Sequence, residues 1–150
     1  MVNQNFKLQL HEHIMSLVND QVLDITKAIN QQNEGAQGNS SAGDKHNTEG
    51  AMQHLELEKK HVQLAMVLQN QQTLQKINFK KGVNSVNTGA LIKMNKGLFY
   101  FSVAMGKIDF LKQEVMVISI ASPIGQILKG LKKGESLTFN EQIWEISEIF

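Results

Sequence analysis

The sequence contains no cysteine and no arginine, and it has only one proline, one tryptophan and one tyrosine. Without cysteine, the chain can form neither a disulfide framework nor a thiolate metal site. Without arginine, lysine supplies all fifteen cationic side chains, and the bidentate contacts that arginine makes to phosphate and guanine are excluded. These absences argue against a disulfide-stapled secreted domain and against sequence-specific DNA binding.

Long apolar runs are also absent. The N-terminus, MVNQNFKLQLHEHIM, lacks the continuous apolar stretch of a signal peptide, and no window approaches the 18 apolar residues of a transmembrane helix. The hydrophobic fraction of 41% is nevertheless sufficient for a packed core. Together with the lack of cysteine, which suits a reducing compartment, these features predict a soluble, cytoplasmic protein with no membrane partner.

Charge is divided unevenly along the chain, whose net charge is +1. Residues 1–75 contain five lysines and eight acidic residues, for a net charge of −3, whereas residues 76–150 contain ten lysines and six acidic residues, for a net charge of +4. An acidic first half and a basic second half predict two different contact surfaces.

Apolar residues at helical spacing occupy the first part of the chain. From about Phe6 they recur every three or four residues, at Leu10, Ile14, Val18, Val22, Ile25 and Ile29. No glycine or proline interrupts them. We therefore predict a long helix with the spacing of a coiled-coil seam.

A second long helix is predicted from Asn47 or Thr48, either of which can act as N-cap, to about Gln75. Four of its apolar residues again have the spacing of a seam: Met52, Leu55, Val62 and Met66. Lys59 falls at the seam position between Leu55 and Val62. Two such helices joined by a loop that is short relative to their length are expected to pack antiparallel.

The segment between these helices, NQQNEGAQGNSSAGDKHNTEG at Asn30–Gly50, is polar and has no aliphatic residue larger than alanine. It predicts a tip loop at about residues 31–50, at the end of an antiparallel coiled-coil hairpin formed by residues 1–75. Residues on such a tip are positioned to reach into another molecule. A compact helical bundle is the alternative, but no third helix of similar length follows.

The second half has a different pattern, in which single glycines separate segments rich in valine, isoleucine and aromatic residues. The predicted strands are Leu91–Met94, Leu98–Ala104, Val115–Ile120, Ser136–Phe139 and Ile143–Ile149. Before the fourth strand we predict a short helix with Ser122 as its N-cap and Pro123 at its first position. Gly130 and Gly134 end it. Residues 76–150 should form a small antiparallel sheet domain with one short helix, which makes the whole chain α+β.

The order of these elements and three short motifs resemble the Gre family of bacterial transcript cleavage factors. The motifs are Ser122-Pro123-Ile124-Gly125, the glycine- and lysine-rich turn from Gly130 to Gly134, and the final strand Ile143-Trp144-Glu145-Ile146. The resemblance spans nearly the whole chain, since the helical hairpin matches too. It implies an FKBP-like second domain that docks on RNA polymerase at the rim of the secondary channel, while the hairpin enters the channel.

The resemblance also assigns a role to the tip. Gre factors carry a Gly-Asp-x-x-Glu-Asn type sequence there, and this chain has Gly43-Asp44-Lys45-His46-Asn47-Thr48-Glu49. Asp44 matches the first acid, but Asn47 stands where the second would fall, and Glu49 lies two residues later. A carboxylate delivered into the channel would retain a weakly held, polymerase-bound Mg²⁺ and orient a water for phosphodiester hydrolysis. Asp44 and Glu49 are therefore the candidate catalytic residues.

The candidate partner-binding residues lie on the second domain. They are Ser122, Pro123, Ile124, Gly125, Lys129, Lys132 and Lys133. The lysines can meet an acidic polymerase surface or an RNA backbone, and a solvated surface is the simpler explanation for them. The expected partner is RNA polymerase, with indirect contact to nascent RNA.

Three functions stay open. The first is a transcription elongation factor that stimulates RNA cleavage by the polymerase and is not itself an enzyme. The second is a non-cleaving relative that modulates or inhibits the polymerase, which the displaced second acid favours. The third is a prolyl isomerase or chaperone module, but an FKBP-like fold alone does not establish that activity.

No metal site is expected in the isolated protein. All five histidines lie within the first 61 residues, and neither His11 and His13 nor His54 and His61 have the four-residue spacing of zinc proteases. The segment Gly89–Gly97 also lacks the spacing of a phosphate-binding loop.

Overall fold

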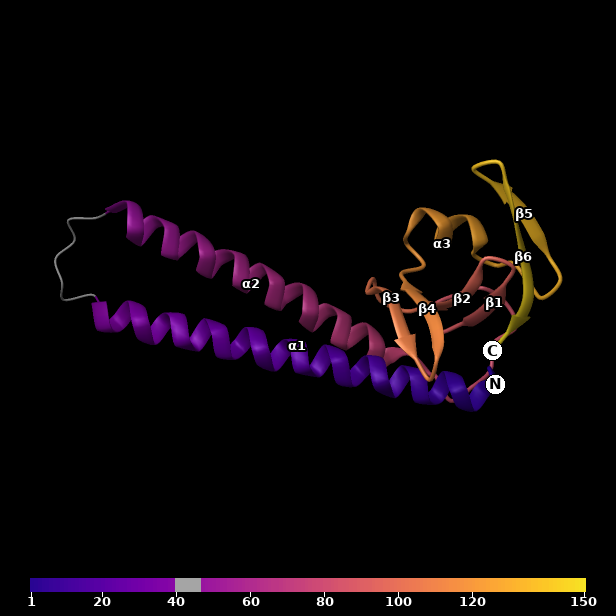
Figure 1. The fold of residues 1–150 in the computed structure, drawn as a ribbon, viewed down its shortest axis with the longest axis horizontal. Helices are drawn as coiled ribbons and strands as arrows, with labels where there is room; N and C mark the ends of the chain where they lie inside the picture. The colour runs from indigo at the N-terminus through magenta and orange to yellow at the C-terminus, as the bar shows by residue number, and fades with distance from the viewer. Residues whose placement is uncertain (40–46) are drawn as a thin grey trace. The chain divides into compact units, whose positions relative to one another are not determined.

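The computed structural model describes the backbone of residues 1–39 and 47–150 and the side chains of residues 1–33 and 50–150. It is α+β, with two long helices followed by a six-stranded sheet and a short helix (Figure 1). The elements are α1 (Gln4–Asn39), α2 (Asn47–Lys76), β1 (Leu91–Met94), β2 (Gly97–Phe101), β3 (Gly106–Phe110), β4 (Gln113–Ile118), α3 (Pro123–Leu128), β5 (Ser136–Phe139) and β6 (Gln142–Ile149). Among the helices of these described ranges, none has the length and hydropathy of a membrane span.

The chain forms two compact units, and α1 contributes to both. Met1–Ile14 and Thr73–Phe150 make up the first, which we call the sheet unit, and Met15–Gln72 make up the second, the helical unit. The sequence pattern predicts a boundary between residues 75 and 76, with all of residues 1–75 in a hairpin. In the structure the first turns of α1 group with the sheet instead, because their side chains pack on it.

α1 continues well beyond its last large apolar residue. The sequence analysis ended it near Ile29 and placed the tip loop at about residues 31–50, whereas α1 extends to Asn39 and α2 begins at Asn47. The predicted loop was too long because glutamine, glutamate and alanine after residue 30 have high helix propensities, and each glycine costs a helix only about 1 kcal/mol. The predicted start of the second helix at Asn47 is confirmed.

Hydrogen bonds join α1 and α2 in antiparallel order within the helical unit. The Gln71 amide, near the end of α2, donates to Asn19 Oδ1 at 2.8 Å. Lys60 Nζ donates to Gln32 Oε1 at 2.6 Å, and Gln32 Nε2 donates to the main-chain oxygen of Gln53 at 2.7 Å. Residues late in α1 therefore meet residues early in α2.

The apolar row predicted for α1 is confirmed. Leu10, Ile14, Val18 and Ile29 are buried, and Val22 and Ile25 are half-buried. One stripe of the helix is therefore covered in both units, as its regular spacing indicates.

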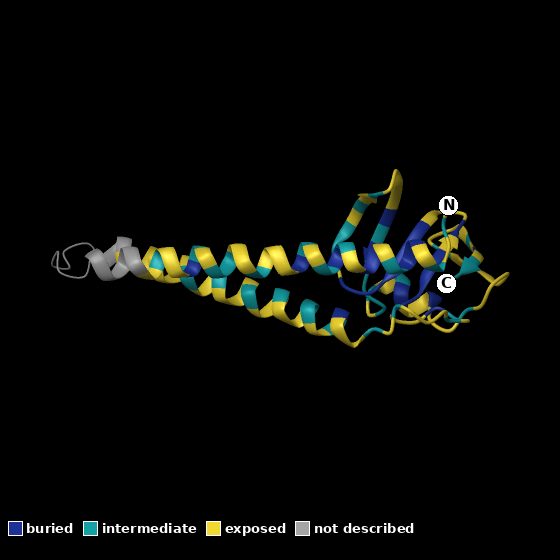
Figure 2. Cartoon of the chain, turned by 90° about the horizontal axis from the view of Figure 1, so that it is seen from below, coloured by how far each residue is buried: buried dark blue, intermediate teal, exposed yellow. Residues whose placement is uncertain are grey.

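α2 carries two apolar rows at heptad spacing, and the row identified from the sequence is not the one that faces α1. Met52, Leu55, Val62 and Met66 are each more than half exposed; together with Lys59 we call them the outer row. Figure 2 shows that exposed and half-buried residues alternate along the long helices. Most of the buried and half-buried positions of α2 form a different row, the inner row: Leu57, Lys60, Leu64, Val67, Gln71 and Leu74. Its two polar members, Lys60 and Gln71, make side-chain hydrogen bonds to α1. A helix can present only one such row to a single partner helix.

The six strands form one mixed sheet in the order β3-β4-β2-β1-β6-β5. Neighbouring strands are antiparallel except β2 and β4, which run parallel with Leu98 opposite Val115 and Phe101 opposite Ile118. The prediction of an all-antiparallel sheet is therefore wrong at this pair. It failed because β3 lies between these strands in the chain and pairs at the sheet edge, which leaves β4 free to run alongside β2.

β3 is a strand that the sequence analysis did not predict. Lys107 and Asp109 are its exposed residues, as is usual for an edge strand. These two charged residues leave β3 without the apolar run that predicts the other strands. The two-residue turn into β4 is formed by Leu111 and Lys112, whose φ angles are 49° and 64°. Turns with this backbone usually contain asparagine or glycine, so the sequence carries no hairpin signal here.

Both faces of the sheet are covered within the sheet unit. On one face a buried core joins the sheet to α3, through Ile92, Met94, Phe99, Phe101, Leu128 and Ile146. Side chains alternate along a strand, so Tyr100 points to the opposite face, where its hydroxyl lies 2.6 Å from His11 of α1. The sheet is therefore packed between α3 and the first turns of α1.

Candidate functional site

The Ser-Pro-Ile-Gly motif begins α3 as predicted. Ser122 is the N-cap, and its Oγ accepts a hydrogen bond from the main-chain N–H of Gly125 at 3.1 Å. Pro123 occupies the first helical position, where a missing N–H costs nothing. Lys129 is the C-cap, and Gly130 follows with a φ of 87°, a left-handed conformation that favours glycine.

Gly125 packs closely against the main chain that precedes α3. A Cβ at this position would lie 2.6 Å from the main-chain oxygen of Ile120 and 2.7 Å from that of Ser119. Ile124 packs against the buried core. Ser122, Ile124 and Gly125 therefore cap α3 or pack it against the rest of the sheet unit. Pro123 is the exposed residue of the motif.

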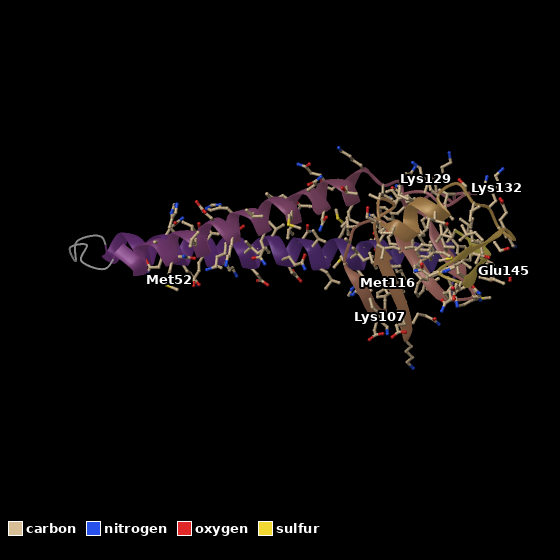
Figure 3. The ribbon with its side chains drawn as sticks, turned by 90° about the horizontal axis from the view of Figure 1, so that it is seen from above. Met52, Lys107, Met116, Lys129, Lys132 and Glu145 are labelled. Atoms are coloured by element: carbon tan, nitrogen blue, oxygen red, sulfur yellow. The ribbon has the colours of Figure 1, made fainter. Side chains whose placement is uncertain are left out.

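The lysines that follow α3 are all exposed. Figure 3 shows Lys129 and Lys132 on one side of the sheet unit and Lys107 on the other. Lys133 is next to Lys132 in the chain, and the main-chain N–H of Lys132 donates to Glu135 Oε1 at 3.0 Å. Three ammonium groups and one carboxylate give this surface a positive charge, which suits an acidic partner.

The structure does not describe the side chains of the two candidate catalytic residues. Asp44 is outside the described residues, and so is the side chain of Glu49. The backbone of Asn47 and Glu49 belongs to the first turn of α2. Glu49 is therefore part of a helix and not of the tip loop that the sequence analysis extended to residue 50.

A buried polar cluster on the α1 face of the sheet was missed by the sequence analysis. The His11 ring is 1% exposed and stacks on Phe79, with a distance of 4.1 Å between ring centroids. Its Nδ1 lies 2.6 Å from the Tyr100 hydroxyl, and the ring also hydrogen-bonds to the main chain of Leu74. This one side chain connects α1 to β2 and to the end of α2.

Lys7 is fully buried one turn before His11. Its Nζ donates to the main-chain oxygens of Lys81 at 3.1 Å and Phe150 at 3.0 Å. These acceptors replace the water that a buried ammonium loses. The sequence signal for this cluster was two polar residues, four apart, on either side of the buried Leu10.

Burial determines the protonation of the cluster. Desolvation lowers the pKa of His11 to about 4; the hydrogen bond to Leu74 opposes this shift and the Lys7 charge reinforces it. Desolvation raises the pKa of Tyr100 well above its usual value, so the hydroxyl keeps its proton and donates a hydrogen bond to Nδ1 of neutral His11. Desolvation also lowers the pKa of Lys7 to about 8, which leaves the ammonium charged at neutral pH.

The arrangement of these groups favours a structural role over catalysis. Histidine and tyrosine can act as base and acid, but His11 and Tyr100 are enclosed and occupy each other's hydrogen-bonding positions. Within the described side chains, no group of three histidine, aspartate or glutamate residues lies close enough to hold a metal ion. The exposed surface beside α3 is therefore the better candidate for binding a partner.

We predict that His11 makes the folded state less stable as the pH falls from about 6.5 to about 4. Its folded-state pKa lies below the ordinary value, so in this range the unfolded chain binds a proton that the folded chain excludes. Between pH 7 and pH 4.5, the free energy of unfolding should drop by on the order of 2 kcal/mol more in the wild type than in His11→Gln. Urea unfolding followed by Trp144 fluorescence measures the difference.

The matched control for this experiment is His61→Gln, because His61 is exposed on α2. Each variant is compared with its own stability at pH 7, so a general loss of stability does not obscure the pH dependence. If the wild type and His11→Gln lost the same free energy on acidification, His11 would not be held neutral by burial.

Gly125→Ala should destabilise the sheet unit by about 1–3 kcal/mol, because the added methyl group overlaps two main-chain oxygens. Gly50→Ala is the matched control, since a Cβ there meets nothing within 4 Å and alanine has the higher helix propensity. Urea unfolding is followed by Trp144 fluorescence for the sheet unit and by circular dichroism for the helices. Wild-type stability in Gly125→Ala would show that the close approach of α3 is not required.

Comparison with known proteins identifies no relative: no family model matches the chain, and neither do any curated proteins or solved structures.

Proposed function

We propose that this chain is a Gre-like transcription elongation factor, which binds RNA polymerase at the secondary channel and stimulates cleavage of backtracked RNA. The polymerase active site would carry out the hydrolysis with its own Mg²⁺, so the chain itself would not be an enzyme. The observation that carries the proposal is the antiparallel pairing of α1 and α2. Residues 40–46, which include Asp44, lie between these two helices in the sequence.

The length of the helices supports a role in reaching an enclosed active centre. At a rise of 1.5 Å per residue, the 36 residues of α1 extend over roughly 54 Å and the 30 residues of α2 over roughly 45 Å. α1 is one unbroken helix whose first turns belong to the sheet unit. A helical pair of this length is suited to carry a carboxylate into a channel.

The facing rows of the two helices support a coiled-coil hairpin. The inner row repeats at intervals of three and four residues, and the covered row of α1 has the same intervals from Val18 to Ile29. Lys60 and Gln71 are the polar members that bond across the pair. Polar residues at such positions fix the register of a coiled coil.

The proposed role of Asp44 is electrostatic. Mg²⁺ binds through one or two carboxylates and keeps several waters. Asp44 would supply one more carboxylate to a metal that the polymerase holds weakly, and it would orient a water for attack on the phosphodiester bond. Glu49 is the weaker candidate, because a carboxylate in the first turn of a helix is favourable without any partner.

The surface beside α3 is the proposed docking site for the polymerase. Ser122, Ile124 and Gly125 hold α3 in place, and the three lysines that follow supply positive charge. Ile127 adds an apolar side chain that is 39% exposed. An apolar centre with a charged rim is a common composition for a protein interface.

We further propose that the sheet unit has the FKBP-like fold that the resemblance implies.

A non-cleaving modulator of the polymerase is the second candidate. Asn47 is neutral where the family's second acid would stand, and the backbone of Glu49 is held in α2. Asp44 would then be the single acid of the motif. Such a protein would occupy the channel without assisting hydrolysis.

A prolyl isomerase is less well supported. That activity needs a pocket lined by aromatic side chains, but Tyr100 and Phe101 are fully buried, and Phe99 packs edge-to-face on Trp144. These rings contribute to the interior of the sheet unit. A proline-isomerisation assay separates this alternative from the two polymerase functions.

The test is an assay of stalled, backtracked RNA polymerase with and without the protein. We expect shortened transcripts with the wild type and loss of at least 90% of the stimulated cleavage with Asp44→Ala, since one charged metal ligand is removed. Binding to the polymerase, measured separately, should be unchanged in this variant.

Asp20→Ala is the matched control, because Asp20 is an exposed acid on α1 away from the connection. If the wild type bound the polymerase but produced no shortened transcripts, the cleavage function would be rejected and the modulator function supported. No binding to the polymerase would contradict both.

A further inference from the structure

The outer row of α2 is an apolar surface that no described part of the chain covers. Met52, Leu55, Val62 and Met66 are 60%, 54%, 61% and 63% exposed. Their three- and four-residue spacing places all four on one face of the helix. Apolar side chains gathered in this way mark an interaction site more often than isolated ones do.

Lys59 lies at the centre of this row, seven residues after Met52 and seven before Met66. It is exposed, and its ammonium makes no hydrogen bond or ion pair with any described residue. A shallow depression at the middle of the row is lined in part by Leu55, Lys59 and Val62. Any helix that covers the row must bury this ammonium, which is costly unless a carboxylate faces it.

Acidic residues flank the row. Glu56 and Glu58 are exposed at the positions on either side of the seam, and Glu58 has its one described ion pair with His54 on the same helix, at 3.2 Å. The row therefore combines a basic centre with acidic edges. A complementary surface has an acidic centre and basic edges.

A second copy of this helix does not have that pattern. A parallel pairing, or an antiparallel pairing centred on Lys59, brings the two Lys59 side chains together. An antiparallel register that moves Lys59 opposite Leu55 brings Glu56 near Glu56 of the other copy and Glu58 near its Glu58, and the opposite shift leaves Lys59 facing Val62. Like charges across an interface oppose association, and an ammonium buried against valine has no counter-charge, so self-association is disfavoured in each register.

We propose that the outer row binds an amphipathic helix of another protein, with a carboxylate at the centre of its apolar face and cations at its edges. The apolar side chains would supply the contact area, and the pair with Lys59 would select the partner and its register. This inference does not rest on the proposed polymerase function.

The probe is a synthetic helical peptide of about 20 residues, with leucine at the seam positions, one central glutamate in the seam and lysines at the edges. A matched peptide has lysine in place of that glutamate. Fluorescence anisotropy measures the binding of each peptide to the full chain. We expect the glutamate peptide to bind at least tenfold more tightly, and Lys59→Glu to reverse the preference, because the charge pair at the centre of the interface is exchanged.

Two further variants complete the experiment. Lys27→Glu makes the same charge change at an exposed lysine of α1 and should keep the preference for the glutamate peptide. The double variant Leu55→Gln, Val62→Gln should weaken the binding of both peptides at least tenfold with unchanged helical circular dichroism.

Three results would overturn the proposal. They are the absence of binding by the wild type, equal binding of the two peptides, and a dimer of the free chain in sedimentation equilibrium that Val62→Gln dissociates. The last would show that a second copy occupies the row. Peptide selection that persists when the cleavage assay fails would leave this inference intact and reject only the polymerase function.

Discussion

The first turns of α1 are held on the sheet by polar groups that do not reach water. Lys7 donates to two main-chain oxygens that lie far apart in the sequence, in Lys81 and Phe150, and His11 bonds to Tyr100 and to Leu74. This polar cluster thereby joins the start of α1 to the end of α2, to β2 and to the residue after β6. An unpaired buried donor or acceptor costs about 1–3 kcal/mol, so these bonds select one arrangement of the sheet unit.

Local rules predicted much of the fold, and long-range contacts account for what they missed. The cap at Ser122, the bounds of β1 and β5 and the apolar row of α1 follow from neighbouring residues, and all are confirmed. The choice between two heptad rows on α2 does not follow from spacing, because both rows satisfy it. The polar partners Asn19 and Gln32 on α1 distinguish them. β3 was missed because its turn has no asparagine or glycine, and the parallel pairing of β2 with β4 depends on that strand.

In the candidate site, too, local sequence patterns predicted some features, while others depend on contacts between distant residues. The sequence identified the Ser-Pro-Ile-Gly motif, and the structure explains its glycine by the main-chain oxygens that leave no room for a Cβ. The lysines after α3 are exposed as expected of a docking surface, while Asp44 stays a prediction from the motif alone. The four-residue spacing of Lys7 and His11 places both on one face of α1, but it could not identify the acceptors of Lys7, since these are main-chain atoms brought together by the fold. The sequence shows Lys59 as a charged residue within an apolar seam. Because that seam is exposed, Lys59 is a candidate for contact with another protein and not with α1.

The central claim is that the buried polar cluster makes the start of α1 part of the sheet unit. Native-state hydrogen exchange tests it most directly, because amides that open in one cooperative unit share one opening free energy. We expect the amides of residues 7–14 to exchange with the same opening free energy as those of Leu98–Phe101 in β2. Exchange of residues 7–14 together with residues 50–66 of α2, at a lower free energy than β2, would contradict the account.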